Sequence, residues 1–323
     1  MLKLEHIFSR HEDERVWCVS WSPCGNYFVT SGEDKVIRLW NVNSKDCIST
    51  LEDGQSRTIR SCEWSPDGRF IASASFDGTV VLWETQDSTF RNWDMVSSLE
   101  GHDNEVKCCA WSASGSLLAT CGRDKKVWIW ENVGGTEFEC VAMLEGHSQD
   151  VKSVKWHPLY DILFSASYDD TIKVWVEDGG DWYCRETLNG HTSTVWSCSV
   201  SASGNQFVSC SDDLSVKLWE CERPDASGKW NTVLTIKNAH EYPIYSIDWS
   251  HHHEYIASAG GDNAIVVFHR RENDSSSIEQ LYRLPSAHEG DVNGVRWNPS
   301  AEKSYYLLSV GDDSLVKLWQ LVI

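Results

Sequence analysis

The chain has few basic residues for its length. It carries 28 Lys and Arg against 48 Asp and Glu in 323 residues, so its formal net charge is −20. Nucleic acids require a basic protein surface, and anionic membranes attract clusters of Lys and Arg. The charge therefore argues against nucleic acid and membrane as partners. It favours good solubility or a partner with basic patches.

Long apolar runs are also missing. Met1 to Arg10 contains no apolar core of the kind found in signal peptides. No stretch approaches membrane-spanning length, which is about 20 apolar residues. We therefore expect a cytoplasmic or nucleocytoplasmic protein.

The twelve cysteines include no C-x-x-C pair, although Cys108 and Cys109 are adjacent. Such pairs are typical of zinc sites and redox motifs. Because most cysteines lie in strand-like runs, we expect reduced structural thiols and no metal or cofactor. The histidines 251–253 stand where other units carry a turn. A His-rich tract can bind metal, but an exposed loop is the simpler interpretation.

What the chain does contain is a long repeat. Seven times an aspartate stands six residues before a tryptophan or phenylalanine, and consecutive aspartates are 43 to 51 residues apart. The pairs are Asp34/Trp40, Asp77/Trp83, Asp124/Trp130, Asp169/Trp175, Asp213/Trp219, Asp262/Phe268 and Asp313/Trp319. This period, with short strands inside each unit, predicts an all-β fold, a seven-bladed WD40-type β-propeller. The repeats cover residues 1–323 as one domain, at approximately 11–50, 55–97, 102–142, 147–187, 191–234, 240–283 and 288–323.

Each unit also carries a hydroxyl four residues before the aspartate, and most carry an earlier histidine. The predicted tetrads are best defined in units three to five: His102, Thr120, Asp124 and Trp130; His147, Ser165, Asp169 and Trp175; His191, Ser209, Asp213 and Trp219. These residue types also occur in hydrolase triads, but a single active site does not need seven copies. We therefore interpret the tetrads as buried hydrogen-bond networks. Unit two has Gln55 in place of histidine, and unit six has Phe268 in place of tryptophan.

The last unit ends just after its third strand, while an alternating segment with Leu2, Leu4 and Phe8 stands at the other end of the chain. We predict that this N-terminal segment completes the last blade, closes the ring and covers the open edge.

Two positions in each unit are expected on one rim of the channel: the residue after the first-strand Val or Ile, and the residue before the turn aspartate. This placement follows from the resemblance to WD40 proteins. The predicted partner-binding rim comprises Arg60, Lys107, Arg123, Lys152, Trp17, Phe76, Tyr168, Trp196 and Tyr245. Arginine and aromatic anchors dominate interface energetics, so this surface suits an acidic peptide with an aromatic side chain or a carboxylate terminus. The alternative is local ion pairing, such as Lys107 with Glu105 and Lys152 with Asp150.

Several segments resemble a particular family. RSCEWSPDGRFIASASFDGTVVLWE (60–84), GHDNEVKCCAWSASGSLLATCGRDKKVWIWE (101–131) and LEGHSQDVKSVKWHPLYDILFSASYDDTIKVW (144–175) closely resemble the WD40 subunit of the cytosolic iron–sulfur assembly targeting complex. The similarity spans the full length. HSQDVK, RDKKVWIWE and SYDD are more specific than the generic repeat.

This resemblance implies a non-catalytic adaptor. The implied partners are a small mixed α/β assembly factor, a HEAT-repeat scaffold and an iron-only-hydrogenase-like cluster carrier, which together deliver [4Fe–4S] clusters to cytosolic and nuclear apoproteins. The resemblance also implies a role for Arg123, because the segment Arg-Asp-Lys at 123–125 matches the family's segment that contains an exposed rim arginine. Leu281, Tyr282 and Arg283 match a tripeptide with which iron–sulfur systems recruit a co-chaperone, although they also alternate as an ordinary strand.

Two other classes are less well supported. The alternative adaptor is a substrate receptor of a cullin ubiquitin ligase. Such receptors usually carry the motif W-D-x-R just after the third strand. This chain lacks the motif, because Trp40, Trp83 and Trp130 are followed by Asn41, Glu84 and Glu131. An enzyme on the propeller rim would need an isolated titratable cluster, which the sequence does not indicate.

Overall fold

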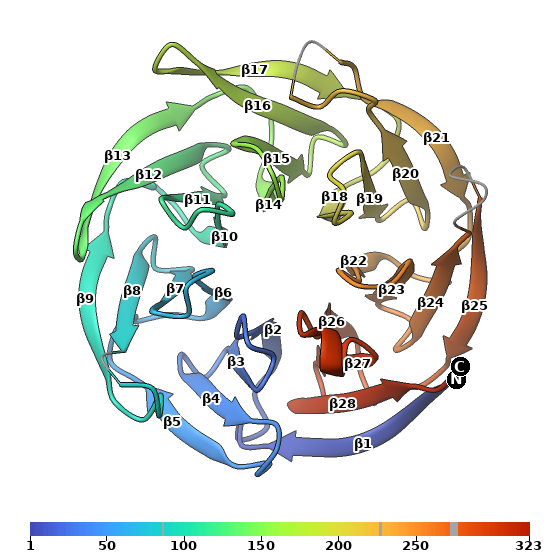
Figure 1. Ribbon diagram of the computed structural model, residues 1–323, viewed down its shortest axis with the longest axis horizontal. Coiled ribbons are helices and arrows are strands. Elements are labelled where there is room, and N and C mark those ends of the chain that lie inside the picture. Colours follow the sequence, from blue (N-terminus) through green and yellow to red (C-terminus); the bar gives the residue numbers. More distant parts are fainter. Residues whose placement is uncertain (86, 226–227, 272–276) are drawn as a thin grey trace.

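In the computed structural model, described residues are 1–85, 87–225, 228–271 and 277–323. Residues 86, 226–227 and 272–276 fall in the second, fifth and sixth predicted repeats and lie outside this description. The described strands form seven four-stranded antiparallel sheets, arranged as blades around a common axis (Figure 1). The predicted all-β, seven-bladed propeller is therefore confirmed.

The strands of each blade follow one another from the axis outward, and their bounds in the first four blades are as follows. Blade one has β2 (Val16–Trp21), β3 (Tyr27–Gly32), β4 (Ile37–Asn41) and β5 (Cys47–Leu51). Blade two has β6 (Ile59–Trp64), β7 (Phe70–Ser75), β8 (Val80–Thr85) and β9 (Trp93–Leu99). Blade three has β10 (Val106–Trp111), β11 (Leu117–Gly122), β12 (Val127–Gly134) and β13 (Glu137–Leu144). Blade four has β14 (Val151–Trp156), β15 (Ile162–Ser167), β16 (Ile172–Asp178) and β17 (Asp181–Leu188).

The remaining blades keep this order until the last strand. Blade five has β18 (Val195–Val200), β19 (Gln206–Ser211), β20 (Val216–Glu220) and β21 (Asn231–Ile236). Blade six has β22 (Ile244–Trp249), β23 (Tyr255–Gly260), β24 (Ile265–Arg270) and β25 (Ile278–Leu284). Blade seven has β26 (Val292–Trp297), β27 (Tyr306–Gly311), β28 (Leu315–Leu321) and, as its outer strand, β1 (Leu2–Ser9). A short 3₁₀ turn, η1 (Ala301–Lys303), precedes β27.

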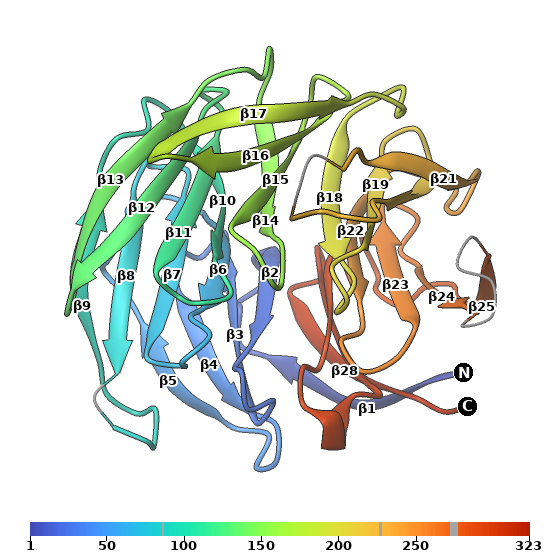
Figure 2. The same ribbon diagram turned by 45° about the horizontal axis from the view of Figure 1, so that its top comes forward.

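The two ends of the chain close the ring. Strand β1 pairs antiparallel with β28, with Leu2 opposite Leu321 and Phe8 opposite Val316. Figures 1 and 2 both show the N- and C-termini side by side at this blade. The predicted closure by the N-terminal segment is confirmed, and it gives β28 a partner on the edge that would otherwise be open.

Burial explains the residue pattern of each blade. The second strand is covered on both faces, so β11 reads as the nearly continuous apolar run Leu117–Gly122, whereas the outermost strand β13 is largely exposed and carries glutamates. Seven apolar clusters fill the seams, and each joins two neighbouring blades. The blades are therefore held to each other mainly by apolar burial. No helix among the described residues is long and apolar enough to span a membrane.

Candidate functional site

The tetrad of blade three is a continuous hydrogen-bonded chain. Nδ1 of His102 lies 2.7 Å from Asp124 Oδ2, and Nε2 lies 2.9 Å from Thr120 Oγ1. Trp130 donates its indole N–H to the same hydroxyl oxygen at 3.0 Å. Because an ionised carboxylate only accepts, Nδ1 carries the proton and Nε2 accepts from Thr120. Trp130 thus donates to Thr120, Thr120 donates to His102, and His102 donates to Asp124.

The aspartate also shapes the turn between β11 and β12. Asp124 Oδ1 accepts a hydrogen bond from the backbone N–H of Lys126 at 3.1 Å, and Lys125 between them has a φ of 68°. Short polar side chains stabilise such turns by bonding the backbone two residues on. Burial alone would raise the pKa of Asp124, but its bonds to His102 and the backbone outweigh burial and lower it. The carboxylate therefore stays ionised.

The same four-residue chain recurs in other blades. In blade four, Nδ1 of His147 lies 2.8 Å from Asp169, Nε2 lies 2.7 Å from Ser165, and Trp175 donates to Ser165 at 2.8 Å. In blade five, the corresponding distances for His191, Asp213, Ser209 and Trp219 are 2.8, 2.7 and 2.9 Å. Blades one and seven build it from His11, Asp34, Thr30 and Trp40, and from His288, Asp313, Ser309 and Trp319.

The tetrad hydroxyls cannot serve as nucleophiles. Thr120, Ser165 and Ser209 are completely buried, and each already interacts with a histidine and a tryptophan. A catalytic hydroxyl must be reachable by substrate next to groups that stabilise an oxyanion. The tetrads therefore stabilise the blades.

Blades two and six depart from the pattern in different ways. In blade two, Gln55 Nε2 donates to the carbonyl oxygens of Ser73 and Thr79, both at 3.1 Å, while its buried Oε1 has no hydrogen-bond partner among the described residues. In blade six, His240 still contacts Ser258 at 2.7 Å, but Phe268 supplies no N–H to that hydroxyl. Each of these blades therefore keeps only part of the network.

A β-bulge positions the candidate binding side chains. In all seven first strands the pairing register shifts at the same place, for example between Val106 and Cys108 in β10, so one extra residue leaves the ladder. Such bulges re-aim a side chain. The extra residues are Trp17, Arg60, Lys107, Lys152, Trp196, Tyr245 and Asn293, and all seven line one cavity of about 60 Å³ at the channel mouth.

Cations lie over aromatic rings at this mouth. Lys107 Nζ is 5.2 Å from the centre of the Phe76 ring, and Lys152 Nζ is 5.0 Å from Tyr168 and 4.8 Å from Trp196. The Arg60 guanidinium is 4.9 Å from Trp17. Such contacts contribute about 0.5–2 kcal/mol each, depending on desolvation. Tyr168 remains 54% exposed and is available to a partner.

Two carboxylates partly neutralise these cations. Glu105 lies 3.5 Å from Lys107 and 3.6 Å from Arg123, and Asp150 lies 3.6 Å from Lys107 and 3.9 Å from Lys152. The local ion pairs that the sequence offered as the alternative interpretation, Lys107 with Glu105 and Lys152 with Asp150, are thus present. Two carboxylates do not balance the four cations Arg60, Lys107, Arg123 and Lys152, so an excess of positive charge remains. Burial, and after it the charge of Lys107, lowers the pKa of Lys152 to about 8. Arg123 stays 56% exposed.

The other half of the mouth is acidic. Asp212 belongs to blade five, and Asp291 and Asp312 belong to blade seven. Burial, followed by the charge of Asp291, raises the pKa of Tyr245 in blade six to about 12. Burial and the charge of Asp312 also raise the pKa of Asp291. The mouth therefore has a basic half over blades two to four and an acidic half opposite, and an acidic partner is attracted only to the first.

The Leu281–Tyr282–Arg283 tripeptide lies in β25, the outermost strand of blade six. Leu281 is 43% exposed, whereas Tyr282 packs against the apolar cluster between blades six and seven. Arg283 donates to Asp262 Oδ2 at 2.7 Å and to the carbonyl oxygen of Ala239 at 3.2 Å. The three side chains do not form one exposed surface, and Arg283 bonds the turn aspartate of its own blade.

The cysteines and the histidine tract form no metal centre among the residues that the structure describes. His252 Nε2 lies 2.8 Å from the carbonyl oxygen of Pro299, and His253 Nε2 lies 2.9 Å from Ser304 Oγ. These contacts join the loop after β22 to the segment around η1 in blade seven. They account for both rings without a bound ion.

Comparison with known proteins identifies the family. The model of the WD domain, G-beta repeat, matches residues 2–41, 45–84, 87–131, 138–176, 182–220, 230–269 and 279–320. The chain is 48% identical to a probable cytosolic iron-sulfur protein assembly protein CIAO1 homolog of Chlamydomonas reinhardtii, over 96% of both chains. It is 49% identical to a probable cytosolic iron-sulfur protein assembly protein Ciao1 of Aedes aegypti, over 95% of this chain and 94% of the relative. A probable cytosolic iron-sulfur protein assembly protein 1 of Candida dubliniensis is 35% identical over 99% of this chain and 100% of its own length.

The chain belongs to this WD-repeat family of cytosolic iron–sulfur protein assembly proteins. The family resemblance noted from the sequence is therefore confirmed. The WD40 propeller is generally a scaffold for protein interactions, not a catalyst. The channel mouth combines bulge-positioned cations with half-buried aromatic rings and the exposed ring of Tyr168.

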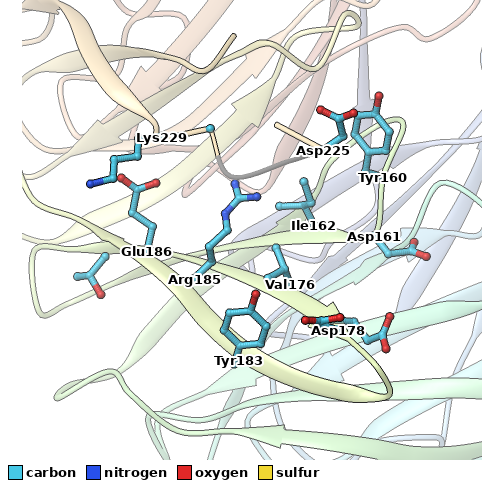
Figure 3. Close-up of a pocket in the computed structure, with 13 residues that line it drawn as sticks. Tyr160, Asp161, Ile162, Val176, Asp178, Tyr183, Arg185, Glu186, Asp225 and Lys229 are labelled. Carbon is cyan, nitrogen blue, oxygen red and sulfur yellow. The ribbon is translucent and has the colours of Figure 1, made fainter. Parts of the chain in front are cut away.

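A second hollow, of about 800 Å³, lies between blades four and five near the outer surface. Figure 3 shows Asp161 and Asp178 at one end, Lys229 beside Glu186 at the other, and Arg185 between them. This hollow was not predictable from the sequence, because its residues come from four separate segments and share no repeat position. Asp225 and Gly228 flank the two residues outside the described structure, and we assign the hollow no ligand.

Proposed function

We propose that this protein is a non-catalytic adaptor of cytosolic iron–sulfur protein assembly, which helps to deliver [4Fe–4S] clusters to cytosolic and nuclear apoproteins. The similarity to relatives with this assembly role, over nearly the full chain, supports the proposal. The cullin-receptor alternative is not favoured by these relatives. The cluster is cargo in this proposal, and the adaptor contributes surfaces only.

The proposed binding surface is the basic half of the channel mouth. Arg60, Lys107, Arg123 and Lys152 provide cations, and Phe76 and Tyr168 provide rings beside them. Exposed anchors of these types carry most of the energy of protein interfaces, about 2 kcal/mol or more when central. The complementary ligand is an acidic peptide with an aromatic side chain or a carboxylate terminus. The acidic half opposite would orient such a peptide by repulsion.

The adaptor would join several proteins through different parts of the ring. The proposed partners are a small mixed α/β assembly factor, a HEAT-repeat scaffold, an iron-only-hydrogenase-like carrier and apoprotein clients. The Leu281–Tyr282–Arg283 tripeptide stays a candidate co-chaperone contact, with Leu281 as its exposed residue. Because Arg283 bonds Asp262, recruitment through all three side chains would require β25 to release that bond.

Charge reversal at Arg123 tests the proposal. Arg123→Glu should abolish co-purification of iron–sulfur assembly factors or clients from cytosol, because it places a carboxylate beside Glu105 in the basic half. The fold should persist, since an exposed ion pair contributes about 0–1 kcal/mol. Lys229→Glu, a matched reversal at an exposed lysine of the outer hollow, should retain the partners. Retained binding by a folded Arg123→Glu protein would refute this surface.

A further inference from the structure

The upper cavity of the channel carries an excess of positive charge. Its volume is about 60 Å³, and its walls are the first strands of all seven blades, which face the axis (Figure 1). Four cations line it: Arg60, Lys107, Lys152 and Arg296. No aspartate or glutamate in the described part of the chain lines it. In a protein with a net charge of −20, this local reversal of sign favours a bound anion.

The half-buried guanidinium of Arg60 has no anionic partner. It lies 4.9 Å from the centre of the Trp17 ring, and none of the residues that the structure describes gives it a hydrogen bond or an ion pair. Lys152 differs, because a carboxylate oxygen of Asp150 lies 3.9 Å from its Nζ. A guanidinium presents five N–H donors, and a charge removed from water is stabilised only by an opposite charge and by hydrogen bonds. The cavity is therefore the place for the missing acceptor.

Three serine hydroxyls lie on neighbouring strands of the same cavity. Ser153, Ser197 and Ser246 occupy the position after the bulge in blades four, five and six, and all three line the cavity. Ser246 Oγ accepts hydrogen bonds from the Val295 N–H and from Arg296 Nη1, both at 3.1 Å, so its own proton is left to donate. Ser153 Oγ is buried and has no partner among the described residues. Hydroxyl donors beside a guanidinium suit the oxygens of a phosphate group.

A second, deeper cavity of about 40 Å³ has acidic groups in its wall. Its lining residues lie further along the same first strands, and they include Glu63 and Asp248. Glu63 Oε1 is 3.8 Å from Lys155 Nζ, and Asp248 Oδ2 accepts a hydrogen bond from the backbone N–H of Trp297 at 2.8 Å. Carboxylates at this depth repel an anion. An anion that enters from the mouth is therefore held in the upper cavity.

We propose that the upper cavity binds a tetrahedral oxyanion, a phosphate or sulfate group, between Arg60, Lys152, Arg296 and the three serine hydroxyls. The volume of about 60 Å³ has room for about four waters at about 15 Å³ each, which matches the four oxygens of such a group. The donors come from five blades, and a tetrahedral group presents oxygens in these different directions, whereas a planar carboxylate presents two. The group is a free ion or the phosphate of a partner's side chain. This inference deepens the proposed function, because it names an anion for the basic half, but the site does not require the adaptor role.

Isothermal titration calorimetry on the full-length protein tests this site at constant pH and ionic strength. Sodium phosphate, sodium sulfate and a short phosphoserine peptide are titrated, with sodium acetate as the planar control. We expect saturable one-site binding of the tetrahedral groups and binding of acetate that is weaker by about tenfold or more. Tighter binding of the peptide than of free phosphate would assign the group to a partner's side chain, and the reverse order to a free ion. No saturable binding, or acetate that binds as tightly as phosphate, would overturn the proposal.

Two variants locate the anion. Arg60→Gln removes the unpaired cation and should weaken phosphate binding by about tenfold or more. Ser197→Ala removes one hydroxyl and should weaken it by about threefold or more. Lys229→Gln, at the outer hollow, should bind phosphate as the wild type does. Unchanged affinity in folded Arg60→Gln and Ser197→Ala proteins would refute the site, and the wild-type ion series still decides if either variant folds poorly. The titrations use the isolated protein, so their failure would leave the co-purification test of the adaptor role unaffected.

Discussion

The indole nitrogen of Trp219 donates to Ser209 Oγ at 2.9 Å, and the equivalent hydroxyl of blade six, Ser258, has Phe268 where that donor would be. Both serines are completely buried, and both lie 2.7 Å from a histidine Nε2. The two blades therefore differ in one buried hydrogen bond at a matched position.

This difference predicts unequal costs for one substitution. Ser209→Ala would leave both His191 and Trp219 without their partner, whereas Ser258→Ala would affect only His240. An unsatisfied buried polar group costs about 1–3 kcal/mol. We expect Ser209→Ala to destabilise the protein by about 1 kcal/mol or more beyond Ser258→Ala in urea unfolding. Equal losses would show that the indole bond contributes little.

The repeat positions were predictable from sequence because each blade needs the same local chemistry. Asp124 and Trp130 stand at a fixed spacing since a turn and half a strand separate them. The placement of the seven bulge residues on the rim followed from the resemblance to WD40 proteins and not from the spacing of the repeat. The acidic half of the mouth was only partly visible, because Asp291 occupies neither of the two repeat positions considered.

The contact of the Cys18 thiol with the carbonyl oxygen of Cys62 could not be found in this way. Cys18 and Cys62 are in different units and at different repeat positions, and they meet only because neighbouring first strands pack together in the closed ring. Cysteines in strand-like runs indicate buried structural thiols, which suits Cys198 and Cys210. Nothing in the local sequence shows that Arg296, from the last blade, lies near Cys18.

The incomplete network of blade two offers a site for a stabilising substitution. Gln55 leaves its Oε1 without a hydrogen-bond partner in the described part of the chain. Gln55→His would place a ring where histidines of other blades bond both the turn aspartate and the strand hydroxyl, here Asp77 and Ser73. We expect stabilisation of about 1 kcal/mol in urea unfolding. Gln55→Ala is the control and should destabilise. A loss of stability in Gln55→His would indicate that the backbone of blade two cannot seat the ring.

Acid should destabilise the protein in two windows. Burial lowers the pKa of His11 and of His288, so below about pH 6.5 the unfolded chain binds more protons at these sites and stability begins to fall. Burial would raise the pKa of Asp313, but His288 outweighs it and lowers this pKa to about 2. The stability that the ionised Asp313 contributes is present above about pH 4. It is lost as the pH falls towards 2, at a cost on the order of 2 kcal/mol in the free energy of unfolding.

Urea unfolding at a series of pH values between about 7 and 3 checks this expectation. Asp313→Asn should be less stable at neutral pH and should lose less stability below about pH 4, because it no longer takes up the proton. A wild-type unfolding free energy that stays constant between about pH 5 and 3 would contradict the assigned role of the tetrad carboxylates.

The ring closure predicts a strong dependence on β1. Phe8 is 2% exposed and packs edge-on against Phe28 at 5.0 Å and Trp40 at 5.3 Å, in the seam between blades seven and one. Deleting residues 1–8 should sharply lower the thermal unfolding temperature, because β28 loses its partner and this seam loses its aromatic filling. Phe8→Ala alone should cost about 3–5 kcal/mol. Leu4→Ala, in the same strand but 43% exposed, should change stability by about 0.5 kcal/mol or less. A deletion variant that melts with the wild type would mean that β28 does not need β1 to hold the ring closed.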